Sequence, residues 1–199
     1  MRRVPVGLLS ITVFVSAILP ANAQIHNWST GQVIPGTEAV TPGPEMILGY
    51  WSTDTHNLRS ADLAGGLDLH GSDFVQSWLD GARFTNANLT GAFFDWATLT
   101  GADLTGATVT GTSFNSTTPT GFTKEQLYST ASYQAGDLRE IGLAGNDLTG
   151  WNLANRNLTG ANFSSATMAG ADLTGATVIG ACFFSTTSKG LTKEQLYST

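Results

Sequence analysis

Large apolar residues recur at every fifth position along most of the chain after residue 57. One run extends from Leu58 to Phe114, with a one-residue slip after Leu63, and a second extends from Leu138 to Phe183. A small residue, often alanine, lies two positions before most of them, and glycine is frequent two positions after. An α-helix rotates by about 100° per residue, so this spacing gives no single apolar face, and a straight strand would send successive residues to opposite faces. The pattern therefore excludes a regular helix and a regular strand.

A chain that turns a corner once in every five residues satisfies the pattern. The central Leu or Phe and the preceding alanine then point inward, and glycine eases the backbone at the corner. Four such sides close a square coil of 20 residues, and stacked coils about 4.8 Å apart exchange backbone hydrogen bonds as strands do. The square coil predicts inward ladders formed by Phe74, Phe94 and Phe114, by Leu69, Leu89 and Val109, and by Phe163 with Phe183.

The repeat itself resembles that of a known family. Triplets such as Ala87-Asn88-Leu89 and Ala102-Asp103-Leu104 are similar to the Ala-(Asp/Asn)-Leu-x-x consensus of the pentapeptide-repeat family, and the resemblance covers residues 58–114 and 138–183. It implies an all-β solenoid, a right-handed quadrilateral β-helix. Trp151 and Arg156 depart from the consensus, because they stand where a small inward residue is expected. We therefore expect the start of the second run to be irregular or splayed.

A longer duplication is superimposed on the short repeat. Residues 122–130 recur almost unchanged as residues 191–199, an offset of 69, which is not a multiple of five. The intervening insertion must leave the coil or reset its phase. Thr123 to Gln126 form a capping box that predicts a short helix, and Thr192 to Gln195 repeat it. We expect these helices to project from the coil, either as a docking knob or, as we favour, as a structural spacer that covers a coil edge.

The amino-terminal residues have the pattern of a secretory signal peptide. Arg2 and Arg3 precede an apolar stretch over residues 6–19, and small residues end at Ala23. The apolar stretch is too short to span a bilayer, so we expect no membrane span, and we expect export to the periplasm or the exterior after cleavage near Ala23. The predicted divisions are 1–23 signal peptide, 24–57 N-terminal cap segment, 58–114 first repeat block, 115–137 insertion with a short helix, 138–183 second repeat block and 184–199 start of a second insertion. Because the second insertion stops at Thr199, we expect either that the chain is truncated or that this end meets another copy, which predicts end-to-end self-association.

The amino-acid composition argues against several kinds of binding site. The 199 residues carry a net charge of −6 with 12% charged side chains, so no dense Lys and Arg footprint exists for nucleic acid. The single Cys182 forms no disulfide framework, and His26, His56 and His70 lack the spacing of metal ligands. We predict no catalytic residues, no metal and no cofactor. Seven aspartates directly before the central residues are expected to bond backbone amides at the turns: Asp62, Asp68, Asp73, Asp103, Asp137, Asp147 and Asp172.

The function that these features favour is that of an exported, non-catalytic scaffold or interaction module whose partner is a protein or a polysaccharide. An alternative is carbohydrate or cell-surface binding, because the outward residues Trp78 and Phe93 are able to stack on sugars. The family resemblance offers a third candidate, a DNA-mimicking binder of topoisomerases. The signal peptide and the scattered carboxylates disfavour this third candidate.

Overall fold

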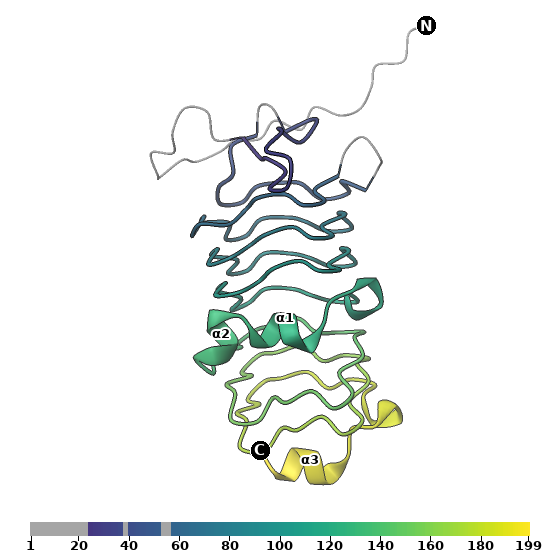
Figure 1. Ribbon diagram of the computed structural model, residues 1–199. Coiled ribbons are helices and arrows are strands. Elements are labelled where there is room, and N and C mark those ends of the chain that lie inside the picture. The colour runs from purple at the N-terminus through teal and green to yellow at the C-terminus, as the bar shows by residue number, and fades with distance from the viewer. Residues whose placement is uncertain (1–23, 38–39, 53–56) are drawn as a thin grey trace, which may run out of the picture.

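The chain winds into a stack of coils, which form a rod with the amino-terminal segment at one end and a short helix at the other (Figure 1). The computed structural model describes residues 24–37, 40–52 and 57–199. The predicted signal peptide and His56 lie outside the described residues. Residues 24–37 and 40–52 fold onto the first coils, where Ile47 pairs in parallel with Asp73, so these residues cover that end of the rod.

Successive coils pair in parallel at intervals of 20 residues. Asn88 pairs with Asp68 on one side and with Thr108 on the other. Equivalent pairs start from three further positions in the same coil, so each coil has four paired sides: Asp73 with Phe93, Trp78 with Thr98, and Arg83 with Asp103. These contacts are isolated bridges rather than long strands, because each side is so short that a turn follows directly.

The interior contains the aromatic ladder that the 20-residue period predicts. The rings of Phe74 and Phe94 are stacked with centroids 4.9 Å apart, and those of Phe94 and Phe114 are stacked at 5.2 Å. In the second block, Phe163 and Phe183 stack at 5.1 Å. The aliphatic residues of the neighbouring ladder are fully buried: Leu69, Leu89 and Val109.

The insertions contain short helices, labelled in Figure 1. The first insertion holds the 3-10 turn η1 (Thr118–Thr120), α1 (Lys124–Tyr128) and α2 (Ala131–Gln134), and the second holds η2 (Thr187–Lys189) and α3 (Lys193–Tyr197). Both predicted capping boxes are present.

The expectation that α1 projects from the coil is wrong, because α1 takes the place of one side of a coil. Phe122 and Leu127 are buried in the common core, and the Phe122 ring stacks on Phe114 at 4.6 Å. The backbone N–H of Gly106 in the preceding coil donates to the carbonyl of Ser129, as a coil-to-coil hydrogen bond would. Because Phe122 and Leu127 pack into the core of the coils, the insertion forms part of the stack.

Gln126 joins α1 to the coil before it. Its Oε1 accepts the N–H of Thr123 at the helix start, while its Nε2 donates to the carbonyls of Leu99 and Ala102 at 2.7 and 2.8 Å. One side chain thus replaces the backbone ladder that a helix is unable to provide. Gln195 makes the same three contacts in the second copy.

The Gln126→Ala variant is expected to lose about 1–3 kcal/mol of unfolding free energy, because partly buried backbone groups lose their partners. Gln195→Ala removes the same contacts at the end of the rod, where local opening is easier, and we expect a smaller loss in global stability. Urea unfolding followed by circular dichroism measures both. Lys124→Ala, on the exposed face of α1, is the control, and equal effects of Gln126→Ala and Lys124→Ala would contradict this role.

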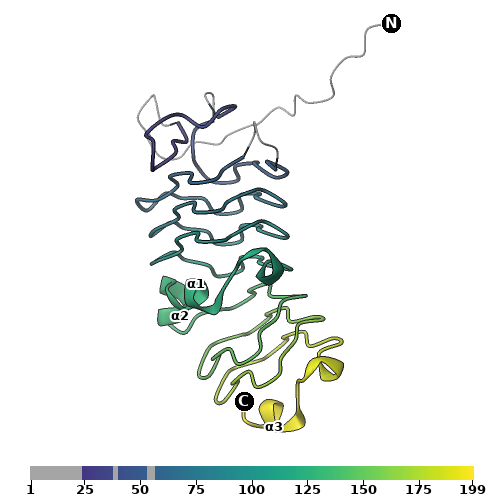
Figure 2. The same cartoon turned by 45° about the vertical axis from the view of Figure 1, so that its right-hand side comes forward.

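On some sides of the coil, the backbone hydrogen-bond ladder continues from the first block to the second. On other sides, side chains make the hydrogen bonds between the two blocks. The backbone N–H of Phe114 donates to the carbonyl of Gly142 at 2.8 Å, which continues the ladder. Around Asn152 the ladder is replaced by tyrosine hydroxyls: its N–H donates to Tyr128 and its carbonyl accepts from Tyr133. The coils after the insertion are tilted relative to those before it, as Figure 2 shows. The rod therefore bends at the insertion.

The two residues that depart from the consensus lie at this bend. Trp151 is buried, with its ring 5.9 Å from that of Phe122, and the Arg156 guanidinium lies 4.2 Å from the centre of the Tyr133 ring. Pairing within the second block stays regular, with Asp137 and Asn157 20 residues apart. The expected splaying thus lies between the blocks, while the second block itself is not irregular.

Candidate functional site

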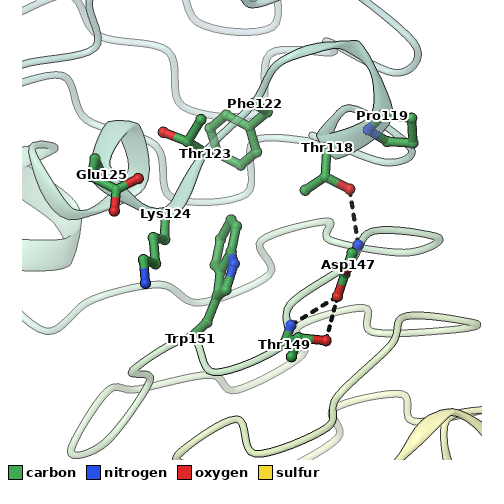
Figure 3. A pocket seen from close by; sticks show the side chains of 9 residues that line it. All are labelled: Thr118, Pro119, Phe122, Thr123, Lys124, Glu125, Asp147, Thr149 and Trp151. Atoms are coloured by element: carbon green, nitrogen blue, oxygen red, sulfur yellow. Dashed lines mark hydrogen bonds between the residues drawn. The ribbon is translucent and has the colours of Figure 1, made fainter.

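A groove opens at the bend, between the first insertion and the coil that follows it (Figure 3). Its volume is about 560 Å³. The residues that line it come from η1, from the segment that leads into the first turn of α1, and from a corner of the next coil: Thr118, Pro119, Phe122, Thr123, Lys124, Glu125, Asp147, Thr149 and Trp151. The bend creates the groove, because the two walls are held apart by large side chains instead of being paired as strands.

The polar groups of the groove are largely fixed by the fold. The Thr118 hydroxyl accepts the N–H of Asp147 at 2.9 Å, in the place of a ladder hydrogen bond. The Asp147 carboxylate accepts the N–H and the hydroxyl of Thr149. Glu125 lies on the opposite side of Trp151 from Asp147 in Figure 3. The groove therefore offers hydroxyls and single charges but no adjacent pair of carboxylates for acid–base catalysis.

The outward aspartates hold turns, which confirms the prediction made from their position. Asp103 Oδ1 accepts the N–H of Thr105 at 2.9 Å, and Asp172 Oδ1 accepts that of Thr174 at 2.9 Å. The same contact, to the N–H two residues later, is made by the other members of the set: Asp62, Asp68, Asp73, Asp137 and Asp147. These carboxylates stabilise corners of the coil.

Several of these carboxylates are more acidic than usual. Hydrogen bonds from the Thr149 side chain and backbone lower the pKa of Asp147 below its ordinary value of 3.8, and Thr174 does the same to the pKa of Asp172. The Arg139 side chain lowers the pKa of Asp137 in the same way. A carboxyl group whose pKa is lower in the folded chain stabilises the fold while it is ionised.

We expect the melting temperature to stay level from neutral pH down to about pH 5 and to fall as the pH drops through and below 3.8. The unfolded chain takes up protons first on acidification, so acid favours unfolding. The double variant Asp147→Asn, Asp172→Asn should flatten this fall while keeping both turns, since Asn162 makes the same bond to the N–H of Ser164. Thermal melts from pH 7 to pH 2 test this, and an unchanged acid profile in the double variant would rule out a role for these aspartates.

The other polar residues singled out from the sequence do not come together. In the described ranges, no three His, Cys, Asp or Glu side chains lie close enough to hold a metal ion. The Nδ1 of His26 lies 3.0 Å from the carbonyl of Gln24, and that of His70 lies 2.9 Å from Asp68. Among the helices of the part that the structure describes, none has the length and hydropathy of a membrane span.

The two predicted surface aromatics differ in their environments. Phe93 is exposed, as expected of an outward position. Trp78 is not a free platform, because the Arg59 guanidinium lies 4.1 Å from its ring centre and is paired with Asp80 at 3.1 Å. Trp78 and Phe93 also belong to different sides of the coil, so they do not form one surface.

Sequence reasoning missed the other large exposed apolar side chains of the described residues, which are Trp28, Ile47, Tyr50, Trp96, Ile179, Phe184 and Tyr197. The signal for Trp96 was present in the repeat. It stands two positions after the central Phe94, at the corner position that glycine often takes.

Comparisons with known proteins identify the same five-residue repeat. The family model for pentapeptide repeats matches eight copies, over residues 79–115 and 147–183. No curated protein matches the sequence.

Solved structures that are similar to this chain include pentapeptide repeat proteins of low sequence identity. The protein Rfr23 of the cyanobacterium Cyanothece 51142 is 20% identical, with 72% of this chain and 77% of that chain covered and a TM-score of 0.24. A pentapeptide repeat protein of the Arabidopsis thaliana thylakoid lumen is 24% identical, with 60% and 66% covered and a TM-score of 0.23. QnrB1, a plasmid-mediated fluoroquinolone resistance protein, is 17% identical, with 63% of each chain covered and a TM-score of 0.28.

The matched residues, 79–115 and 147–183, cover most of the two runs of five-residue spacing on either side of the insertion. Such repeats imply a right-handed β-helix solenoid, in agreement with the parallel pairing of the coils. Over residues 79–115 and 147–183 the chain thus consists of repeats of the pentapeptide repeat family.

Proposed function

We propose that this protein is an exported, non-catalytic scaffold that binds a partner through the side of its rod. The observation that carries the proposal is a contrast between two kinds of surface residue. The outward aspartates are engaged in turns, whereas large apolar side chains such as Phe93 and Trp96 are left exposed. Exposed apolar side chains gathered on one surface are typical of interaction sites.

Export is supported by the signal-peptide pattern of residues 1–23. The test is expression of the full chain in a bacterial host, followed by cell fractionation and mass measurement. We expect the secreted or periplasmic fraction to contain a chain that begins at Gln24. Recovery of the uncleaved chain, starting at Met1, in the cytoplasm would overturn the export proposal.

Binding to a topoisomerase is the candidate that the surface disfavours. DNA mimicry needs a continuous acidic surface, whereas here arginines lie among the aspartates: Arg59 pairs with Asp80 and Arg139 with Asp137. We expect residues 24–199 to leave DNA supercoiling by gyrase unchanged. Inhibition at low protein concentration would replace the scaffold proposal with this candidate.

Carbohydrate binding is the second candidate function, and the exposure of Phe93 favours it. Aromatic rings present a flat apolar face to which the C–H face of a sugar ring packs, while the sugar hydroxyls reach neighbouring polar groups.

A further inference from the structure

Four large exposed apolar side chains lie on one side of the rod and its adjoining corner. Ile47 pairs with Asp73, which pairs with Phe93, so these three residues form one column down the side. The N–H of Tyr50 donates to the coil of Asp73, and the N–H of Gln76 donates in the same way to the next coil. Tyr50, Gln76 and Trp96 therefore form a second column, at the corner.

The apolar members of these two columns are well exposed. The exposed fractions are 49% for Ile47, 66% for Tyr50, 48% for Phe93 and 54% for Trp96. They form two pairs, Ile47 with Tyr50 and Phe93 with Trp96, that lie on the first and third of three successive coils. Because coils are about 4.8 Å apart, the two pairs are separated by about 10 Å along the rod.

The corner residues hold an unusual backbone conformation. Tyr50 has a φ of 65° and Trp96 a φ of 56°, in the left-handed region where glycine is favoured. The corner geometry of the coil imposes this conformation, since Ser60, Asn86 and Ser116 adopt it at other corners, but a bulky aromatic residue is uncommon there.

The residues around the two pairs are mixed, since Val75 lies between Asp73 and Gln76 and Asp95 lies between Phe93 and Trp96. Asp73 and Gln76 occupy the middle coil, and Gln76 is exposed. The Asp73 carboxylate is half-buried against Gly49 and accepts the N–H of Val75 through Oδ1. The aromatic side chains are thus interspersed with polar ones, whereas a protein interface commonly has a contiguous apolar centre with a polar rim.

We propose that this surface, formed by Ile47, Tyr50, Asp73, Gln76, Phe93 and Trp96, binds an extended polysaccharide that lies along the rod. Two sugar rings pack on the Tyr50 and Trp96 corners, and the hydroxyls between them bond to Asp73 and Gln76. Equatorial β-1,4 linkages give a straight chain with accessible ring faces, which is the class of ligand that the two-coil spacing fits. The inference rests on the proposed scaffold function and names its ligand.

The test uses residues 24–199 with cellulose and chitin in sedimentation assays, and with cellohexaose and chitohexaose in calorimetry. We expect the unmodified protein to bind at least one of these β-1,4-linked glycans. Tyr50→Ala and Trp96→Ala should each weaken binding about tenfold, the equivalent of about 1.4 kcal/mol, and Gln76→Ala should weaken it less. Phe184→Ala, an exposed aromatic residue outside the two columns, is the matched control and should bind normally.

The outcomes separate the inference from the function on which it rests. Absence of binding to all four glycans, or equal losses in Trp96→Ala and Phe184→Ala, overturns the polysaccharide site. Sedimentation velocity of the same variants tests whether a second copy of the chain, rather than a polysaccharide, binds this surface. A self-association that Trp96→Ala abolishes would overturn the polysaccharide site and leave the interaction scaffold standing. Circular dichroism verifies that the variants fold, as we expect because all four substituted side chains are exposed.

Discussion

Replacement of Phe94 by alanine should lower the free energy of unfolding by about 3–5 kcal/mol. Phe94 is fully buried and has aromatic neighbours on three sides. Its ring is stacked between those of Phe74 and Phe114, and the Phe84 ring packs edge-on against it with the ring centroids 5.4 Å apart. Because corners and ladders fix the coil above and below, the interior has little freedom to close around the cavity.

The neighbouring residue provides the control for this prediction. Phe93 is adjacent in sequence and identical in type, but it points outward. Phe93→Ala should change the free energy of unfolding by less than about 0.5 kcal/mol, as is usual for surface positions. Urea unfolding followed by circular dichroism measures both variants. Equal losses at positions 93 and 94 would mean that inward and outward positions have been assigned wrongly.

The regular coils could be predicted from the sequence because each repeat carries its own information. The position of a residue such as Phe94 in the five-residue period predicts that its side chain points inward. Its ladder partners lie 20 residues before and after it in the sequence. The role of Asp103 was likewise local, since its partner is the N–H of Thr105. Neither inference required knowledge of distant contacts.

The insertion and the exposed surfaces could not be predicted in the same way. Whether α1 projects or fills a side depends on Phe122 and Leu127 meeting a core built by other coils. Trp78 was expected to be free, yet Arg59, from the preceding coil, covers its ring. The period also does not reveal that Tyr50 aligns with Trp96, because residues 24–57 lack the repeat.

Gln126 and Gln195 explain structurally why the segment around them recurs at an offset of 69 residues. A short helix is unable to continue a parallel ladder, so each copy uses one glutamine to satisfy two carbonyls of the coil before it. Gly121 adds a second requirement: its φ is 101°, and a Cβ there would lie 2.8 Å from the backbone nitrogen of Thr100. The repeated segment is thus a unit that replaces a side of the coil and closes against the coil before it.

Trp151→Ala should have an effect as large as that of Phe94→Ala, about 3–5 kcal/mol, but with a different consequence for cooperativity. Trp151 is buried at the bend, and its ring lies 5.9 Å from Phe122 and 6.4 Å from Tyr128. It therefore stabilises the contact between the two blocks rather than the interior of either one.

In a solenoid, stability is the sum of the stabilities of the repeats and of their interfaces, so a weakened interface uncouples its neighbours. We expect Phe94→Ala to destabilise the first block, and Trp151→Ala to split a single unfolding transition into two. Calorimetry and urea unfolding monitored by tryptophan fluorescence distinguish these results, with Trp96→Ala as the control for loss of an exposed indole. One unchanged, cooperative transition in Trp151→Ala would show that the backbone ladder from Phe114 to Gly142 couples the blocks by itself. Two transitions would show that the bend, and the groove that it opens, depend on this one side chain.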